Sequence, residues 1–133
     1  MNDERTWRPV EPTAQRRLRV WTTPQQGALV VHVVGEVDLN SAPLLGAALE
    51  EALGTAGAPP VVVDLTDVEY LSAHGLTALV EARRRALAHR QPLRVVIDET
   101  RPVILPLEIT GLDEILRLYR TVADALTPRA EIT

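Results

Sequence analysis

The segment YLSAHGL, residues 70–76, carries the side chains of this chain that are best suited to catalysis. Ser72 offers a hydroxyl and His74 an imidazole, and together with Asp64 they could be imagined as a serine hydrolase triad. However, Ser72 and His74 are only two residues apart in an expected tight turn, and no G-x-S-x-G nucleophile elbow is present. Asp64 and Asp67 are better explained as carboxylates that accept hydrogen bonds from loop amides. A Ser/His hydrolase is therefore a remote alternative, and we expect a protein that is not an enzyme.

Metal and cofactor sites have no signature in this sequence. The three histidines, His32, His74 and His89, are far apart, and there is no cysteine that could supply a thiolate. Neither a G-x-G-x-x-G fingerprint nor a P-loop is present, so the spacing of the glycines gives no argument for a phosphate site. We therefore expect no metal and no cofactor.

The charge balance argues against nucleic acid as a partner. The chain has 14 basic and 18 acidic residues and a formal net charge of −4, so it lacks the basic surface that a phosphate backbone requires. No apolar stretch approaches the roughly 20 residues that span a bilayer, and the charged N-terminal segment has no hydrophobic signal core. We therefore expect a soluble, cytoplasmic protein without membrane insertion.

The hydrophobic pattern predicts one α/β domain over residues 16–127, between a flexible N-terminal tail (1–15) and a C-terminal tail (128–133). Apolar or alternating runs predict strands at 17–22, 28–34, 60–66, 92–98 and 114–120, and amphipathic runs predict helices at 41–54, 75–89, 100–111 and 121–127. In the order β-β-α-β-α-β-α-β-α, each interior helix joins two strands. This order predicts a mostly parallel sheet of four to five strands with about four helices.

Two short motifs make the sequence resemble a known family. The first is GEVD (35–38), directly before the first expected helix. The second comprises DL (64–65), YL (70–71) and GL (75–76), which precede the second helix at fixed spacing. Both resemble the signatures of the STAS domain, the family of bacterial anti-sigma factor antagonists and of the cytoplasmic tails of sulfate transporters. The resemblance covers about residues 16–127 and implies a STAS-like fold, in agreement with the predicted order of elements.

The resemblance implies a binding module. Antagonists of this family bind an anti-sigma factor that is also a serine kinase, and they thereby release a sigma factor for transcription. The kinase then phosphorylates the first serine of an Asp-Ser-Ser-Gly turn, and the added charge of about −2 ends the contact. By this resemblance the partner-binding residues are Asp38, Ser72, Ala73, His74, Gly75 and Leu76, together with the exposed face of the second helix.

The turn departs from the family's pattern at the phosphorylated position. Ser72 stands where the family has Asp, Ala73 where it has the phosphorylated serine, and His74 where it has the second serine. Ala73 cannot accept a phosphate. Three interpretations stay open: a constitutive antagonist or scaffold without the phosphoswitch, a modification shifted to Ser72 beside a helix N-terminus, or a purely structural turn with the function elsewhere.

Two other roles within the family stay open as well. The chain could be the STAS subunit of a transport system, or a scaffold similar to those of stressosomes. The sequence does not identify the partner or the sigma factor, and it leaves the oligomeric state open.

Overall fold

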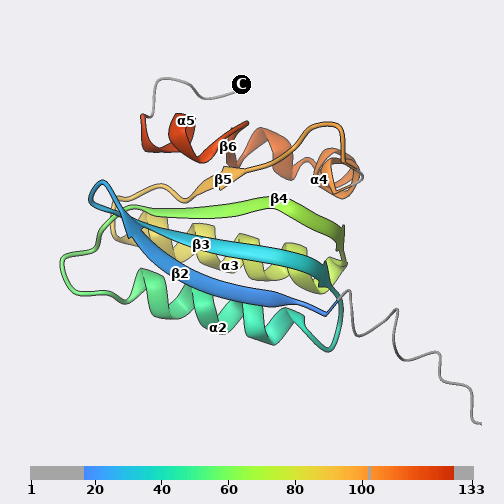
Figure 1. The fold of residues 1–133 in the computed structure, drawn as a ribbon, viewed down its shortest axis with the longest axis horizontal. Coiled ribbons are helices and arrows are strands. Elements are labelled where there is room, and N and C mark those ends of the chain that lie inside the picture. The colour runs from blue at the N-terminus through green and yellow to red at the C-terminus, as the bar shows by residue number, and fades with distance from the viewer. Residues whose placement is uncertain (1–16, 102, 128–133) are drawn as a thin grey trace, which may run out of the picture.

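The computed structural model of the chain describes residues 17–101 and 103–127. The predicted tails, 1–15 and 128–133, lie outside these residues. Among the described residues, five strands form one sheet in the order β2-β3-β4-β5-β6 (Figure 1). The strands are β2 (Arg19–Gln25), β3 (Ala28–Val37), β4 (Val61–Leu71), β5 (Arg94–Val96) and β6 (Arg117–Tyr119). β2 and β3 are antiparallel and the other neighbours are parallel, which confirms the prediction of a mostly parallel sheet.

β2 and β3 form a hairpin at one edge of the sheet. Gln26 and Gly27, which connect them, both have positive φ (48° and 80°), as the type I′ turn of a two-residue hairpin loop requires. The register places Trp21 opposite His32, and their rings stack with centroids 5.1 Å apart. The hairpin therefore adds one antiparallel strand to an otherwise parallel sheet.

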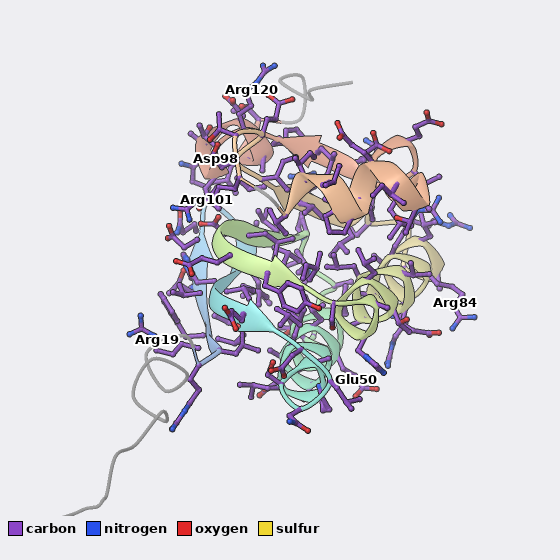
Figure 2. The ribbon with its side chains drawn as sticks, turned by 90° about the vertical axis from the view of Figure 1, so that its right-hand side faces the viewer. Arg19, Glu50, Arg84, Asp98, Arg101 and Arg120 are labelled. Atoms are coloured by element: carbon purple, nitrogen blue, oxygen red, sulfur yellow. The ribbon has the colours of Figure 1, made fainter. Side chains whose placement is uncertain are left out.

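Helices cover both faces of the sheet. They are α2 (Ala42–Leu53), α3 (Ala73–Ala88), α4 (Ile104–Thr110) and α5 (Val122–Leu126), and a short 3-10 helix, η1 (Leu112–Glu114), precedes β6. α2, α3 and α4 bury Leu45, Leu79 and Leu107 in the larger core on one face (Figures 1 and 2). α5 buries Ala125 in a smaller core on the other face. Within residues 17–101 and 103–127, the four α-helices agree with the predicted number and order.

The inner strands are valine-rich because they are buried on both faces. Neighbouring residues of a strand point to opposite faces, so a strand between two cores needs a continuous apolar run. Val31, Val63 and Val95 belong to the larger core, and Val30, Val62 and Val96 belong to the smaller one. Leu, Val, Ile and Ala side chains thus form most of the core without any phenylalanine, and Tyr119 is fully buried in the smaller core.

The passage from β4 to α3 is shorter than the sequence predicts. β4 continues to Leu71, beyond the predicted end at residue 66, because its pairing with β3 extends to the Val37–Leu71 pair. α3 begins at Ala73 rather than at Gly75. A single residue, Ser72, therefore separates the strand from the helix.

The third predicted helix, 100–111, is also shorter than expected. Thr100 does not cap it, because its amide and hydroxyl both donate to Asp98 Oδ1, at 3.0 and 2.6 Å. α4 instead begins at Ile104, so Pro106 lies in its first turn, where its missing amide proton is not needed. The end is as predicted: Gly111 follows α4 in the left-handed conformation, with φ of 78°.

The apolar stripes predicted for α2 and α3 are wider than the faces that these helices bury. The 3.6-residue period puts Leu44, Val80 and Leu87 in those stripes. In the structure these three side chains are 49%, 37% and 45% exposed, respectively. A helix that lies on a sheet buries only one stripe, and in α3 this stripe consists of Gly75, Leu76, Leu79, Ala82 and Ala86.

Candidate functional site

The carboxyl ends of β3 and β4 lie next to each other and position both sequence motifs. Val37 pairs with Leu71, and the amide of Ser72 donates to the carbonyl oxygen of Val37 at 2.8 Å. Asp38 and the turn 72–76 therefore lie together at the carboxyl ends of these two strands. In open α/β sheets, ligands commonly bind at the carboxyl ends of the strands.

Ser72 forms the N-cap of α3. Its backbone is extended, with φ of −79° and ψ of 172°, and its Oγ accepts a hydrogen bond from the amide of Gly75 at 3.3 Å. Its carbonyl oxygen accepts a bond from the amide of Leu76 at 3.0 Å. The half-buried hydroxyl thus satisfies one of the amides that the start of a helix leaves without a partner.

Ala73 and His74 are the first two residues of α3, and both are exposed. The carbonyl oxygen of Ala73 accepts a bond from the hydroxyl of Thr77 at 3.0 Å, which continues the first turn of the helix. A methyl group and an imidazole therefore occupy the outer surface of the turn. This surface carries no carboxylate of its own.

Gly75 and Leu76 are buried and act as the support of the turn. A Cβ on Gly75 would lie 2.6 Å from Leu71 Cδ1 and 2.8 Å from Val37 Cγ1, which is closer than side chains can approach. Leu76 is 8% exposed and belongs to the larger core. The glycine therefore allows α3 to start directly against the ends of β3 and β4.

Asp38 holds the loop between β3 and α2. Its Oδ1 accepts hydrogen bonds from the amide of Ser41 at 2.9 Å, the hydroxyl of Ser41 at 2.9 Å and the amide of Asn40 at 3.0 Å. These bonds, the one from the Ser41 amide above all, lower the pKa of Asp38 below its ordinary value. The carboxylate is exposed, so it places a fixed negative charge beside the neutral turn.

Leu39 and Tyr70 flank the site, and sequence reasoning did not select either of them as a contact residue. Leu39 is 62% exposed and Tyr70 is 52% exposed. Tyr70 pairs with Glu36 near the end of β4, and Leu39 directly follows Asp38. In the sequence, only their position next to the two motifs indicates that they could be contact residues. The apolar pattern alone does not distinguish an exposed side chain from a buried one.

The imagined hydrolase triad is not assembled. Asp64 pairs with His32 and Val96 in the sheet, and its Oδ1 accepts bonds from the amide and hydroxyl of Thr66 at 3.0 and 2.7 Å. Ser72 lies eight residues further along, which corresponds to roughly 25 Å of extended strand. Asp64 therefore bonds to a residue of its own strand, β4, and not to a loop amide as its sequence context predicted, and it cannot orient His74.

No group of three or more His, Asp or Glu side chains among residues 17–101 and 103–127 is arranged to hold a metal ion. Within the same residues, no helix has both the length and the apolar character needed to cross a membrane.

The chain is similar to known proteins that are named anti-sigma factor antagonists. The chain is 33% identical over 119 residues to the anti-sigma-F factor antagonist RsfB of Mycobacterium tuberculosis, and the match covers 86% of this chain and 92% of RsfB. A crystal structure of an anti-sigma factor antagonist from Mycobacterium paratuberculosis is 34% identical, with a TM-score of 0.74 over 84% of this chain and 93% of that one.

More distant likeness extends to the fold alone. An anti-sigma-factor antagonist (STAS) domain protein from Planctomyces limnophilus is 19% identical, with a TM-score of 0.66 over 81% of this chain and 94% of that one.

A family model described as "Mlab, STAS domain" matches residues 21–118, from β2 into β6. The two motifs, the strand order and this match agree, and the chain belongs to the STAS domain family.

Proposed function

We propose that this protein is an anti-sigma factor antagonist: it binds an anti-sigma factor and thereby frees a sigma factor for transcription. The names of the relatives from the two mycobacteria support this function, since both match more than four fifths of the chain. The observation that carries the proposal is the meeting of Asp38 with the exposed Ala73 and His74 at one edge of the sheet. Such a module acts by binding in the cytoplasm and does not need catalytic groups.

The partner surface of this proposal has a contact part and a support. Asp38, Ala73 and His74 are exposed and supply contacts, and Ser72 is half-buried behind them. Gly75 and Leu76 are buried, so they contribute by fixing the shape of the turn. The partner is an anti-sigma factor of the serine-kinase type, which would meet a neutral turn next to one carboxylate.

The proposed antagonist binds constitutively. Ala73 occupies the family's phosphorylated position and is exposed, but it has no hydroxyl. The Ser72 hydroxyl is half-buried, and its oxygen accepts a bond from the amide of Gly75, so it is less accessible to a kinase than a hydroxyl at the exposed residue 73 would be. Intact mass measurement after incubation with the anti-sigma kinase and ATP tests this directly. We expect no added phosphate, and a phosphate mapped to Ser72 would contradict constitutive binding.

Charge at residue 73 is the sharpest test of the surface. We expect Ala73→Glu to raise the Kd for the anti-sigma factor at least about tenfold, because the partner must accommodate an unpaired carboxylate beside Asp38. Isothermal titration calorimetry measures this Kd. Ala73→Gln has nearly the same size without the charge, and the difference between the two variants isolates the electrostatic part.

Controls separate this surface from general effects. Ala123→Glu puts the same charge on an exposed position of α5 and should leave the Kd unchanged. Equal affinity of wild type and Ala73→Glu would refute the proposed surface. If wild type forms no complex with kinase-type anti-sigma factors, the antagonist function itself fails, and the transport-subunit and scaffold roles take its place.

A further inference from the structure

Apolar side chains gather on the outside of α3, α4 and η1, away from the proposed docking turn. They are Val80 and Leu87 of α3, Leu105 and Ile109 of α4, and Ile115 directly after η1. All five are among the exposed large hydrophobic residues, and Ile109, with 75% of its surface exposed, is the most exposed of those that the structure describes. We call these five residues the α3–α4 face.

The two residues of α3 lie on the flank that points toward η1. The flank next to α2 carries Arg85, which forms an ion pair with a glutamate of α2. Val80 and Leu87 lie on the opposite flank, together with Arg83 between them. The Nε of Arg83 donates to the carbonyl oxygen of Ile115 at 3.1 Å, so this flank contacts the segment after η1.

The two residues of α4 point away from the core. Leu107 is fully buried, and Leu105 and Ile109 lie two residues on either side of it, on the opposite side of the helix. Figure 2 shows α4 beside α3 on the side of the molecule from which Arg84 projects. Leu87 and Ile115 also line one small hollow of 200 Å³. Val80, Leu87 and Ile115 therefore lie where α3 faces the segment after η1, and Leu105 and Ile109 lie on the outer side of α4.

Charges without an ion-pair partner surround the α3–α4 face and are divided by sign. Glu108 of α4 and Asp113 and Glu114 of η1 form no ion pair with any other described residue. The same holds, within residues 17–101 and 103–127, for Arg90 after α3 and for Arg117 at the start of β6. Arg117 lines the same hollow as Leu87 and Ile115. Acidic groups thus occupy the α4–η1 part, and basic groups occupy the part where α3 ends and β6 begins.

We propose that the α3–α4 face joins two copies of this chain in a two-fold symmetric dimer. In a two-fold interface the same patch of both subunits meets itself, and so a patch with an acidic and a basic part can be complementary to its own copy. The acidic part of each copy would face Arg90 and Arg117 of the other, with the apolar residues between them. This charge division favours a second copy over a different protein as the occupant.

The dimer does not depend on the proposed antagonist function. The α3–α4 face starts at Val80, more than one helical turn beyond His74, so Asp38 and the turn 72–76 stay accessible in the dimer. Of the exposed face of α3 that was expected to contact the partner, the dimer covers the flank with Val80 and Leu87. The two proposals can therefore fail separately.

Molecular mass in solution tests the dimer. Sedimentation equilibrium of the full chain should give about twice the 14.6 kDa of one copy at high concentration. Ile109→Glu should give the mass of one copy under the same conditions, because the charge would be buried at the centre of the interface. Since Ile109 is 75% exposed in one copy, the variant should keep its fold, which circular dichroism checks. The matched control is Leu39→Glu, at a 62% exposed residue outside the face, which should remain a dimer.

A charge-reversal series tests the self-complementary arrangement. Glu108→Arg with Glu114→Arg should raise the dimer dissociation constant at least about tenfold, because like charges would then face each other. Adding Arg90→Glu and Arg117→Glu should restore the dimer. The proposal is overturned if wild type stays a monomer up to about 1 mM, if Ile109→Glu remains a dimer, or if the fourfold variant is no more dimeric than the double one.

Discussion

The starts of α2 and α3 lie at the same edge of the sheet, but they are built in opposite ways. α2 follows a loop in which one carboxylate, Asp38, accepts three hydrogen bonds and remains negatively charged. α3 follows a single residue, Ser72, whose neutral hydroxyl accepts one longer bond, and its first exposed side chains are uncharged or basic. One helix start carries a fixed charge, and the other carries none.

Under the proposed antagonist function, this difference makes binding sensitive to a charge introduced at the start of α3. Both N-termini attract negative charge through their free amides, but the amides around Asp38 already have a carboxylate. A negative charge added at residue 73 would be new to the surface and would stand near an existing one. A partner that fits the neutral turn must then desolvate or repel it, whereas an additional charge near α2 would change less.

The tight junction at α3 should have the largest effect on stability. Gly75→Ala forces a Cβ to within 2.8 Å of Val37 Cγ1, an atom of a stiff β-branched side chain. We expect a loss of about 1–3 kcal/mol in the free energy of unfolding, measured by urea denaturation.

Gly46 of α2 is the matched control for this junction. A Cβ at Gly46 would have no atom within 4 Å, so Gly46→Ala gains helix propensity without a clash. It should stabilise the protein by up to about 1 kcal/mol. The comparison fails if both variants change stability in the same direction.

The charge at the start of α2 should make stability depend on pH. The pKa of Asp38 is lowered in the folded protein, so its ionisation stabilises the fold above its unfolded pKa of about 3.9 and this contribution is lost as the pH falls. We expect wild type to have a higher Tm than Asp38→Asn at pH 7. The difference should shrink below about pH 4 as the carboxylate takes up its proton.

Thermal unfolding of both proteins between neutral and acidic pH measures this difference. Asp98, whose pKa is also lowered, is present in both proteins, so its contribution cancels in the comparison. A Tm difference that does not change on acidification would show that the Asp38 side chain acts through its shape alone.

The sequence predicted those features that depend on local pattern and on the two motifs. The continuous valine runs indicated inner strands, and GEVD and the 64–76 segment located Asp38 and Ser72 at the ends of β3 and β4. It did not predict the start of α4, because the competing bonds from Thr100 to Asp98 leave no trace in hydrophobic periodicity. Hydrophobic periodicity shows which residues share one face of a helix. It does not show which other elements cover that face.

The exposed apolar residues show the same limit. Val80 and Leu87 have the spacing of core residues, and yet 37% and 45% of their surfaces are exposed. Leu39 lies in the loop after β3 and Tyr70 near the end of β4, and both are more than half exposed. Such exposure is a property of the assembled layers, and the spacing of residues in one segment cannot give it.

The hydroxyl at the start of α3 should have the smallest effect of the three. Ser72→Ala removes the single 3.3 Å bond to the Gly75 amide and should cost about 0.5–1 kcal/mol in the free energy of unfolding, at the lower end for N-caps. Thr121→Ala is the reference, because Thr121 caps α5 in the same way through a 3.0 Å bond from the amide of Asp124. Ser72→Asp should keep the stability of wild type, since a carboxylate is an equally good cap, and it makes the start of α3 resemble that of α2. A loss well above about 1 kcal/mol in Ser72→Ala, without rescue by Asp, would show that this hydroxyl does more than cap the helix.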